Sequence, residues 1–242
     1  MKRTTTIIVL GAAVLLLSQN AAVGAIFGDG GIALQGMLDA VTVDPAGNSS
    51  IDVLTDYIPD GGDSYWAVSA SGSSIATLVV ELAAVQQSGN KFGIFQLGNP
   101  SNNIELFNGT EFYGTKTVTV LEDFTILVNY IPQGNFGMNG FGYYLATDGG
   151  VTWYSDTTLN VDGMDHMLAY QGNDSDVLKL GMFAPGIFQS SEYILAFEDQ
   201  REILPNYDDF VVLVESVIPV PEPATMVLLG IGGLIMRRRR KV

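Results

Sequence analysis

Short apolar runs separated by turn residues are the main pattern between residues 26 and 220. In residues 115–121, threonines alternate with Val118 and Val120, which is the two-residue period of a β-strand. Similar runs lie at 124–130, 141–147, 151–154, 166–170, 193–197 and 210–217. They are rich in β-branched and aromatic residues and are separated by Gly, Pro, Asn and Asp. This spacing predicts a mostly β domain, and we expect an antiparallel β-sandwich with a jelly-roll-like arrangement.

One segment fits two periods. Apolar residues at 75, 78, 79, 82 and 85 recur at helical spacing, whereas the Thr-Leu-Val-Val run at 77–80 favours a strand. We expect a strand that continues to about Leu82. Residues 26–70 are expected to form a looser N-terminal part. Because no fixed-period repeat or Pro- or Ser-rich linker interrupts residues 26–219, we predict a single extracellular domain there.

The first 25 residues have the three parts of a secretory signal peptide. Lys2 and Arg3 precede an apolar run at 7–17, and the small residues Val23-Gly24-Ala25 follow. A retained anchor is the alternative, but a membrane span needs about 20 apolar residues. We therefore predict removal of residues 1–25 by signal peptidase, with cleavage after Ala25.

The C-terminus has a second three-part signal. Pro221-Glu222-Pro223 precedes an apolar run at 224–236, and a basic cluster then closes the chain: Arg237, Arg238, Arg239, Arg240 and Lys241. This order is typical of a stop-transfer segment whose basic end stays cytoplasmic. As a helix the run is about 20 Å long, short against a hydrocarbon core of about 30 Å. A short transmembrane helix that acts as a transient processing signal fits better than a permanent anchor. An uncut anchor and a nucleic-acid patch are the alternatives.

Residues 220–242 resemble the PEP-CTERM sorting signal of Gram-negative bacteria, with its motif, apolar helix and arginine cluster all present. The resemblance implies that an exosortase, an inner-membrane protease, recognises Pro221, Glu222 and Pro223 and cleaves nearby. It also implies that the inner membrane holds the precursor only transiently. The expected destination is the cell surface or the extracellular polysaccharide of a biofilm matrix.

The body between the two signals is strongly acidic. All 26 Asp and Glu lie between Asp29 and Glu222, and the body has only four basic residues, Lys91, Lys116, Lys179 and Arg201. This charge repels phosphate backbones, so we expect no nucleic-acid partner. With no Cys and a single histidine, the usual Cys/His zinc site cannot form, and Ca²⁺ is the metal that the oxygen-rich composition favours. Solubility alone is the alternative explanation of the charge.

Acidic residues flank one predicted strand–loop–strand unit. Glu198 and Asp199 follow the run at 193–197, and Asn206, Asp208 and Asp209 precede the run at 210–217. If the two strands pair, these side chains meet at one end and offer oxygen ligands for Ca²⁺. The alternative is turn chemistry, since Asp and Asn cap turns and occupy solvated strand ends.

The same unit, Phe197-Glu198-Asp199 followed by residues 206–212, is similar to the closing motif of a bacterial family catalogued as domain of unknown function 4114. Shorter matching pieces lie at 92–95, 106–109, 141–145 and 165–170, so the resemblance covers about residues 75–217. It implies a secreted β-sandwich. The chain departs from the family's pattern in three places. Asn206 stands where the family usually has Asp, and Asp208 stands where it usually has Asn. The loop at 200–204 is not Gly-rich, as the family's loop is.

No nucleophile elbow, phosphate loop or dinucleotide motif occurs in the chain. We interpret His166 as a hydrogen-bonded structural residue rather than a general base. The sequence therefore favours a non-enzymatic surface or matrix protein, associated with extracellular polysaccharide and binding Ca²⁺. A secreted carbohydrate-active enzyme that uses paired carboxylates is the alternative.

Overall fold

The computed structural model describes residues 34–59, 61–69, 73–81, 89–109, 114–181, 183–200 and 206–220. Several predicted features lie outside these residues: the signal peptide with cleavage after Ala25, the Pro221–Pro223 motif, the apolar run at 224–236 and the basic cluster. Among the described residues, no helix is long and apolar enough to cross a membrane.

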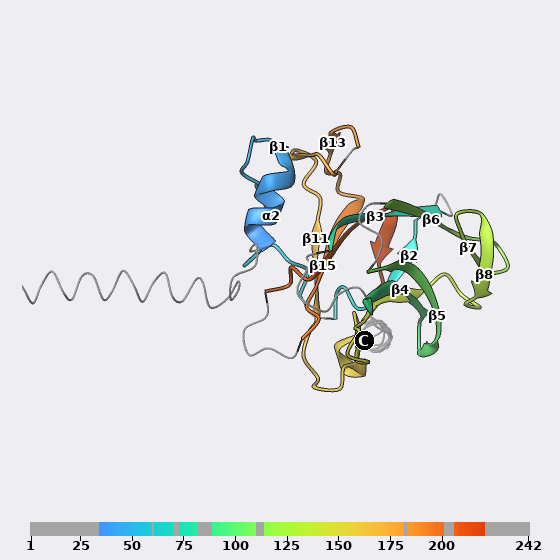
Figure 1. The fold of residues 1–242 in the computed structure, drawn as a ribbon. Helices are drawn as coiled ribbons and strands as arrows, with labels where there is room; N and C mark the ends of the chain where they lie inside the picture. The colour runs from blue at the N-terminus through green and yellow to red at the C-terminus, as the bar shows by residue number, and fades with distance from the viewer. Residues whose placement is uncertain are drawn as a thin grey trace, which may run out of the picture.

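The described chain is mostly β, and its strands form three antiparallel sheets (Figure 1). The seven-stranded sheet has the order β11 (Met167–Gln171), β14 (Glu192–Phe197), β15 (Phe210–Glu215), β3 (Ser73–Glu81), β6 (Gly114–Val120), β7 (Thr125–Val128) and β8 (Ile131–Asn135). The six-stranded sheet has the order β16 (Val217–Pro219), β2 (Trp66–Val68), β9 (Phe141–Ala146), β4 (Lys91–Gln96) and β5 (Asn99–Asn108), and β10 (Thr152–Tyr154) pairs with β9. The smallest sheet joins β1 (Thr42–Asp44), β12 (Val177–Leu178) and β13 (Gly186–Ile187).

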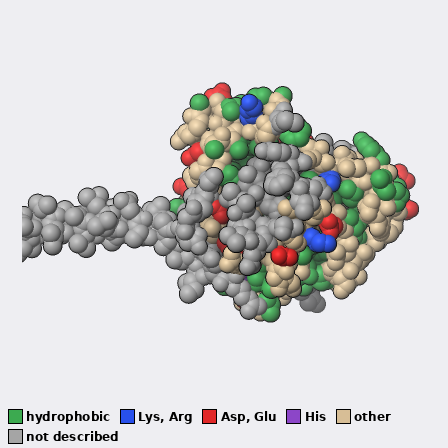
Figure 2. Space-filling model, viewed as in Figure 1, with side chains coloured by type: hydrophobic (Ala, Val, Ile, Leu, Met, Phe, Trp, Pro, Cys, Tyr) green, Lys and Arg blue, Asp and Glu red, His purple; other side chains and the backbone are tan. Residues whose placement is uncertain are grey.

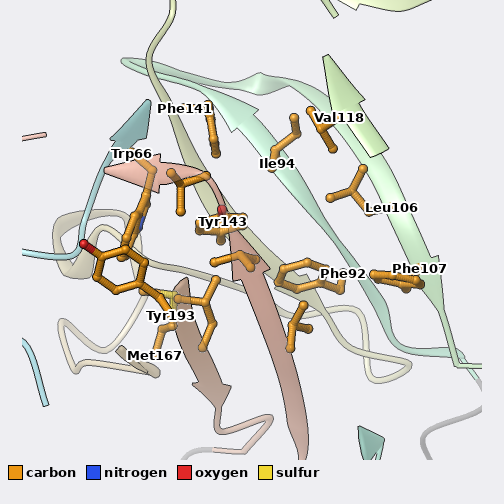
Figure 3. Packing of buried hydrophobic residues seen from close by; sticks show 14 of the residues in the cluster. Trp66, Phe92, Ile94, Leu106, Phe107, Val118, Phe141, Tyr143, Met167 and Tyr193 are labelled. Atoms are coloured by element: carbon orange, nitrogen blue, oxygen red, sulfur yellow. The ribbon is translucent and has the colours of Figure 1, made fainter. Parts of the chain in front are cut away.

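One buried cluster takes its side chains from both larger sheets. Phe92 on β4 stacks on Phe210 of β15 with 5.3 Å between ring centroids. Trp66 on β2 meets Tyr193 of β14 edge-on at 4.8 Å. Figure 3 shows Trp66 beside Tyr193, with Tyr143 and Phe92 close by. Aromatic contacts of this kind add to the stability that burial of apolar area supplies.

A second apolar layer covers the other face of β14 and β15. It includes α2 (Leu34–Val41), whose Leu34, Met37 and Leu38 are buried. Figure 1 shows α2, β1 and β13 together at one end of the molecule. Along β14, Tyr193, Leu195 and Phe197 enter the first cluster while Ile194 and Ala196 enter this second layer. Burial on both faces explains why residues 193–197 and 210–214 are continuous apolar runs.

The structure confirms the mostly β, antiparallel class, and the sandwich arrangement stays a prediction. The ambiguous segment is strand β3, as expected. The helix α2 was not predicted, because Leu34, Met37, Leu38 and Val41 lie in the part that we expected to be looser. A short 3-10 helix, η2 (Thr157–Leu159), begins after Asp156, whose side chain accepts a hydrogen bond from Thr158 N–H.

Candidate functional site

The three carboxylates of Glu198, Asp199 and Asp209, named here the acidic turn, come together where β14 ends and β15 begins. Phe197 and Phe210 are directly opposed in the antiparallel pair, so the residues just beyond them meet at the same end. One oxygen from each of the three side chains lies within 4.8 Å of the other two. The predicted pairing of the two strands is therefore confirmed.

Glu198 holds the two ends of the loop together. Its side chain is buried, and its Oε1 accepts a hydrogen bond from Gln200 N–H at 3.0 Å. Its Oε2 accepts a hydrogen bond from Asn206 N–H at 2.9 Å and a longer one from Tyr207 N–H at 3.5 Å. Tyr207 has a φ of 53°, a conformation that few residues other than Gly adopt. The carboxylate of Glu198 thus stabilises an unfavourable backbone turn.

Asp209 is a buried carboxyl group with two acidic neighbours. Its Oδ2 accepts a hydrogen bond from Asp199 N–H at 3.0 Å. Burial, followed by the charges of Glu198 and Asp199, raises the pKa of Asp209 to about 9. Without a cation, the acidic turn therefore holds a proton at neutral pH, because like charges at this distance do not ionise together in a buried place.

Asp199 is held by partners that are distant in sequence. Its Oδ2 accepts a hydrogen bond from Asn90 Nδ2 at 3.3 Å, and its backbone oxygen accepts one from Trp153 Nε1 at 2.8 Å. Its Oδ1 is buried without a hydrogen-bond partner. In the described part of the chain, no Lys or Arg forms an ion pair with Glu198, Asp199 or Asp209. Asn90 and Trp153 are the supporting residues that the sequence did not reveal.

His166 packs beneath the acidic turn. Its ring stacks on Trp153 with 3.6 Å between centroids, and the side chain is buried. Its Nδ1 donates to the carbonyl oxygen of Glu198 at 3.1 Å, and its Nε2 lies 3.1 Å from Asp162 Oδ2. The structure confirms the expected hydrogen-bonded histidine, with Asp162 as its side-chain partner.

The other two predicted ligands are Asp208 and Asn206. Asp208 is buried but does not belong to the group of three carboxylates. The side-chain oxygen of Asn206 accepts a hydrogen bond from Asp208 N–H at 3.4 Å. The structure thus brings together three of the four predicted carboxylates. Three carboxylates supply hard oxygen ligands, and Ca²⁺ completes six to eight with backbone oxygens and water.

The described part of the chain is mostly β. On the face shown in Figure 2, its acidic side chains are scattered and its basic side chains are few. The family described as the PEP-CTERM protein-sorting motif matches residues 219–241 of the chain. This match agrees with the signal predicted at 220–242. It identifies the chain as an exported protein that is sorted by an exosortase and has a membrane-associated precursor.

No curated protein and no solved structure matches the chain. The resemblance of residues 75–217 to the domain of unknown function 4114 stays a prediction.

Proposed function

We propose that this exported protein is a non-enzymatic component of the cell surface or matrix that binds Ca²⁺ at the acidic turn and lies among extracellular polysaccharides. The observation that carries the proposal is the approach of three carboxylate oxygens to within 4.8 Å at the paired ends of β14 and β15. Two of the three residues, Glu198 and Asp209, are buried.

Charge compensation favours a bound cation at the acidic turn. Buried carboxylates at this distance repel one another, and either a proton or a cation relieves the repulsion. Ca²⁺ suits the position because it prefers carboxylate oxygens and tolerates irregular geometry. The ion displaces the proton of Asp209, since metal ligands must be deprotonated. It then ties the end of β14 to the start of β15.

The extracellular location sets the affinity that we expect for Ca²⁺. Extracellular Ca²⁺ modules bind with dissociation constants of about 0.1–1 mM. A site of this strength is occupied outside the cell, where it contributes stability in a chain without disulfides. The mature protein gains its full stability only after export.

A carbohydrate-active enzyme is the second candidate. The observation that favours it is the raised pKa of Asp209 beside two further carboxylates, as a general acid requires. Asp209 is only 6% exposed, which leaves little surface for a sugar. Turnover of a polysaccharide that is lost in Asp209→Asn would favour this candidate over the first.

Terbium luminescence tests the proposal directly. Tb³⁺ occupies oxygen-rich Ca²⁺ sites and emits when a nearby indole is excited. Trp153 donates its Nε1–H to Asp199, so the antenna lies beside the expected ion. We expect emission on excitation of tryptophan and its loss on addition of Ca²⁺.

Amide variants locate the signal. The Asp199→Asn/Asp209→Asn protein should lose the emission, whereas Glu122→Gln, a change at an exposed acid elsewhere, should keep it. An absence of emission from the wild-type protein, or equal emission from the double variant, contradicts the proposal.

A further inference from the structure

A hollow of about 280 Å³, named here the outer hollow, lies on the outer face of the six-stranded sheet across β10, β9, β4 and β5. On β9, Tyr143 and Leu145 enter the inner cluster, so Tyr144 faces outward and lines the hollow. Tyr154 of β10 and Glu105 of β5 line it as well. Its volume is close to the lower end of the range for small-molecule sites, so it accepts one ring-sized group.

The strand register places two tyrosines and a carboxylate in one row across the outer hollow. Tyr154 is directly opposed to Tyr144 on β9. Tyr144 is in turn opposed to Gly93 on β4, and Gly93 to Glu105 on β5. Because Gly93 has no side chain, the ring of Tyr144 lies across it, and a Cβ there would be 2.7 Å from Tyr144 Cε1. Burial, followed by the charges of Glu105 and Tyr154, raises the pKa of Tyr144 to about 12, so its hydroxyl keeps the proton.

An ion pair also lines the outer hollow. Lys91 Nζ lies 3.0 Å from Glu105 Oε2, and the two side chains are 55% and 40% exposed. An exposed pair of this kind adds little to stability. Lys91 and Glu105 are the only charged residues among the described lining residues, so the lining has no net charge. This is unusual in a body with 26 acidic and only four basic residues.

The chemistry of the lining fits a neutral sugar. The exposed amide of Asn103 and the hydroxyl of Thr152 join the two phenols and the ion pair, so donors and acceptors surround the hollow. Sugar hydroxyl groups both donate and accept hydrogen bonds, and the half-buried ring of Tyr154 offers an apolar surface to the C–H face of a sugar ring. A polyanion is repelled by the acidic body, and a simple cation finds the carboxylate of Glu105 already paired.

We propose that the outer hollow binds one sugar residue of a neutral hexose polysaccharide, whose ring lies against Tyr154. The hydroxyl groups of the sugar hydrogen-bond to Lys91, Glu105 and the hydroxyl of Tyr144. This proposal rests on the proposed function in one respect, the association with extracellular polysaccharide, and it gives that association a site.

The outer hollow is separate from the acidic turn. The acidic turn lies at the ends of β14 and β15, which belong to the other large sheet. Trp153, which donates to Asp199, points to the opposite side of β10 from Tyr154. Sugar binding in the outer hollow therefore does not require Ca²⁺.

The test compares neutral and acidic oligosaccharides of equal length. The neutral probes are cellotetraose, mannotetraose and galactotetraose, and the acidic probe is tetragalacturonate. Each is titrated calorimetrically into the full chain in a detergent without a sugar head group, and the heat of titration into detergent alone is subtracted. We expect saturable binding of at least one neutral probe and none of tetragalacturonate.

Variants of the lining locate the bound sugar. Lys91→Met/Glu105→Gln keeps the length of both side chains and should weaken binding of the neutral probe at least tenfold. Tyr144→Phe removes only a hydroxyl group and should weaken it severalfold. Lys179→Met and Glu122→Gln, changes at exposed charges outside the hollow, should match the wild type. A cooperative urea transition would show that each variant is folded.

Three results would overturn the proposal. One is the absence of saturable binding of every neutral probe to the folded wild type. Another is binding of tetragalacturonate as tight as that of the neutral probes. The third is unchanged affinity in the folded Lys91→Met/Glu105→Gln variant, since the sugar would then bind elsewhere. Terbium emission reports on the acidic turn alone, so failure of the outer hollow and failure of the Ca²⁺ site are distinguishable.

Discussion

Replacing Asp209 by Asn should change how the stability of the ion-free protein depends on pH. The amide keeps an oxygen that can accept the hydrogen bond from Asp199 N–H, which is 3.0 Å long in the wild type. It has no proton to lose. The variant therefore removes the titration of this position and leaves the shape of the acidic turn nearly unchanged.

The magnitude follows from the pKa of Asp209, which is about 9 in the folded chain against 3.8 for an ordinary aspartate. Between these values the folded protein holds a proton that the unfolded chain has released. Stability is then highest at low pH and falls as pH rises toward the folded pKa, by about 1.4 kcal/mol for each pH unit. From pH 5 to pH 8 the wild type should lose about 4 kcal/mol relative to Asp209→Asn.

Urea denaturation at pH 5, 6, 7 and 8 in the presence of chelator measures this difference. Each protein is followed by tryptophan fluorescence, and the free energies of unfolding are compared at each pH. Saturating Ca²⁺ should flatten the wild-type curve, because the ion takes the place of the proton. If the free energies of unfolding of the wild type and Asp209→Asn change in parallel with pH in the presence of chelator, then Asp209 is not protonated in the folded protein at neutral pH.

The remaining predictions concern processing and packing. Mass spectrometry of the protein from its natural host should show an N-terminus after Ala25 and a C-terminus near the Pro-Glu-Pro motif, and an intact arginine-rich tail would contradict sorting by an exosortase. Phe92→Ala should destabilise the protein by about 3–5 kcal/mol in urea denaturation, because the ring is fully buried among other aromatic rings; a loss below about 1 kcal/mol would contradict this packing. Gly93→Ala should destabilise the protein by about 1–3 kcal/mol, since the new Cβ would lie 2.2 Å from the carbonyl oxygen of Ile104. Gly134→Ala should be nearly neutral, because its new Cβ has its nearest contact at 3.5 Å. Equal urea midpoints for the two variants would refute this.

Much of the strand content could be predicted from local patterns. The alternation at 115–121 identifies β6, and the continuous apolar runs at 193–197 and 210–217 identify β14 and β15. The last run is in fact divided between β15 and β16, which belong to different sheets. Ser216, between them, has a φ of 59° and marks this change of direction. Nothing in the residue types signals such a switch.

The candidate site was predictable where it is local and not where it depends on tertiary contacts. Glu198 and Asp209 flank one turn between two adjacent strands, so their approach follows from the pairing alone. Asn90 and Trp153 reach Asp199 across 109 and 46 residues, and only the arrangement of the sheets brings them there.

Thermal unfolding with excess Ca²⁺ and then with chelator tests whether the acidic turn of this exported protein binds Ca²⁺. A ligand that binds only the folded state at 100 times its dissociation constant adds about 2.7 kcal/mol of stability. We predict a clear rise in the unfolding midpoint with Ca²⁺, reversed by chelator and absent in Asp199→Asn/Asp209→Asn. A midpoint that does not respond to Ca²⁺, or that responds equally in the double amide variant, would contradict it.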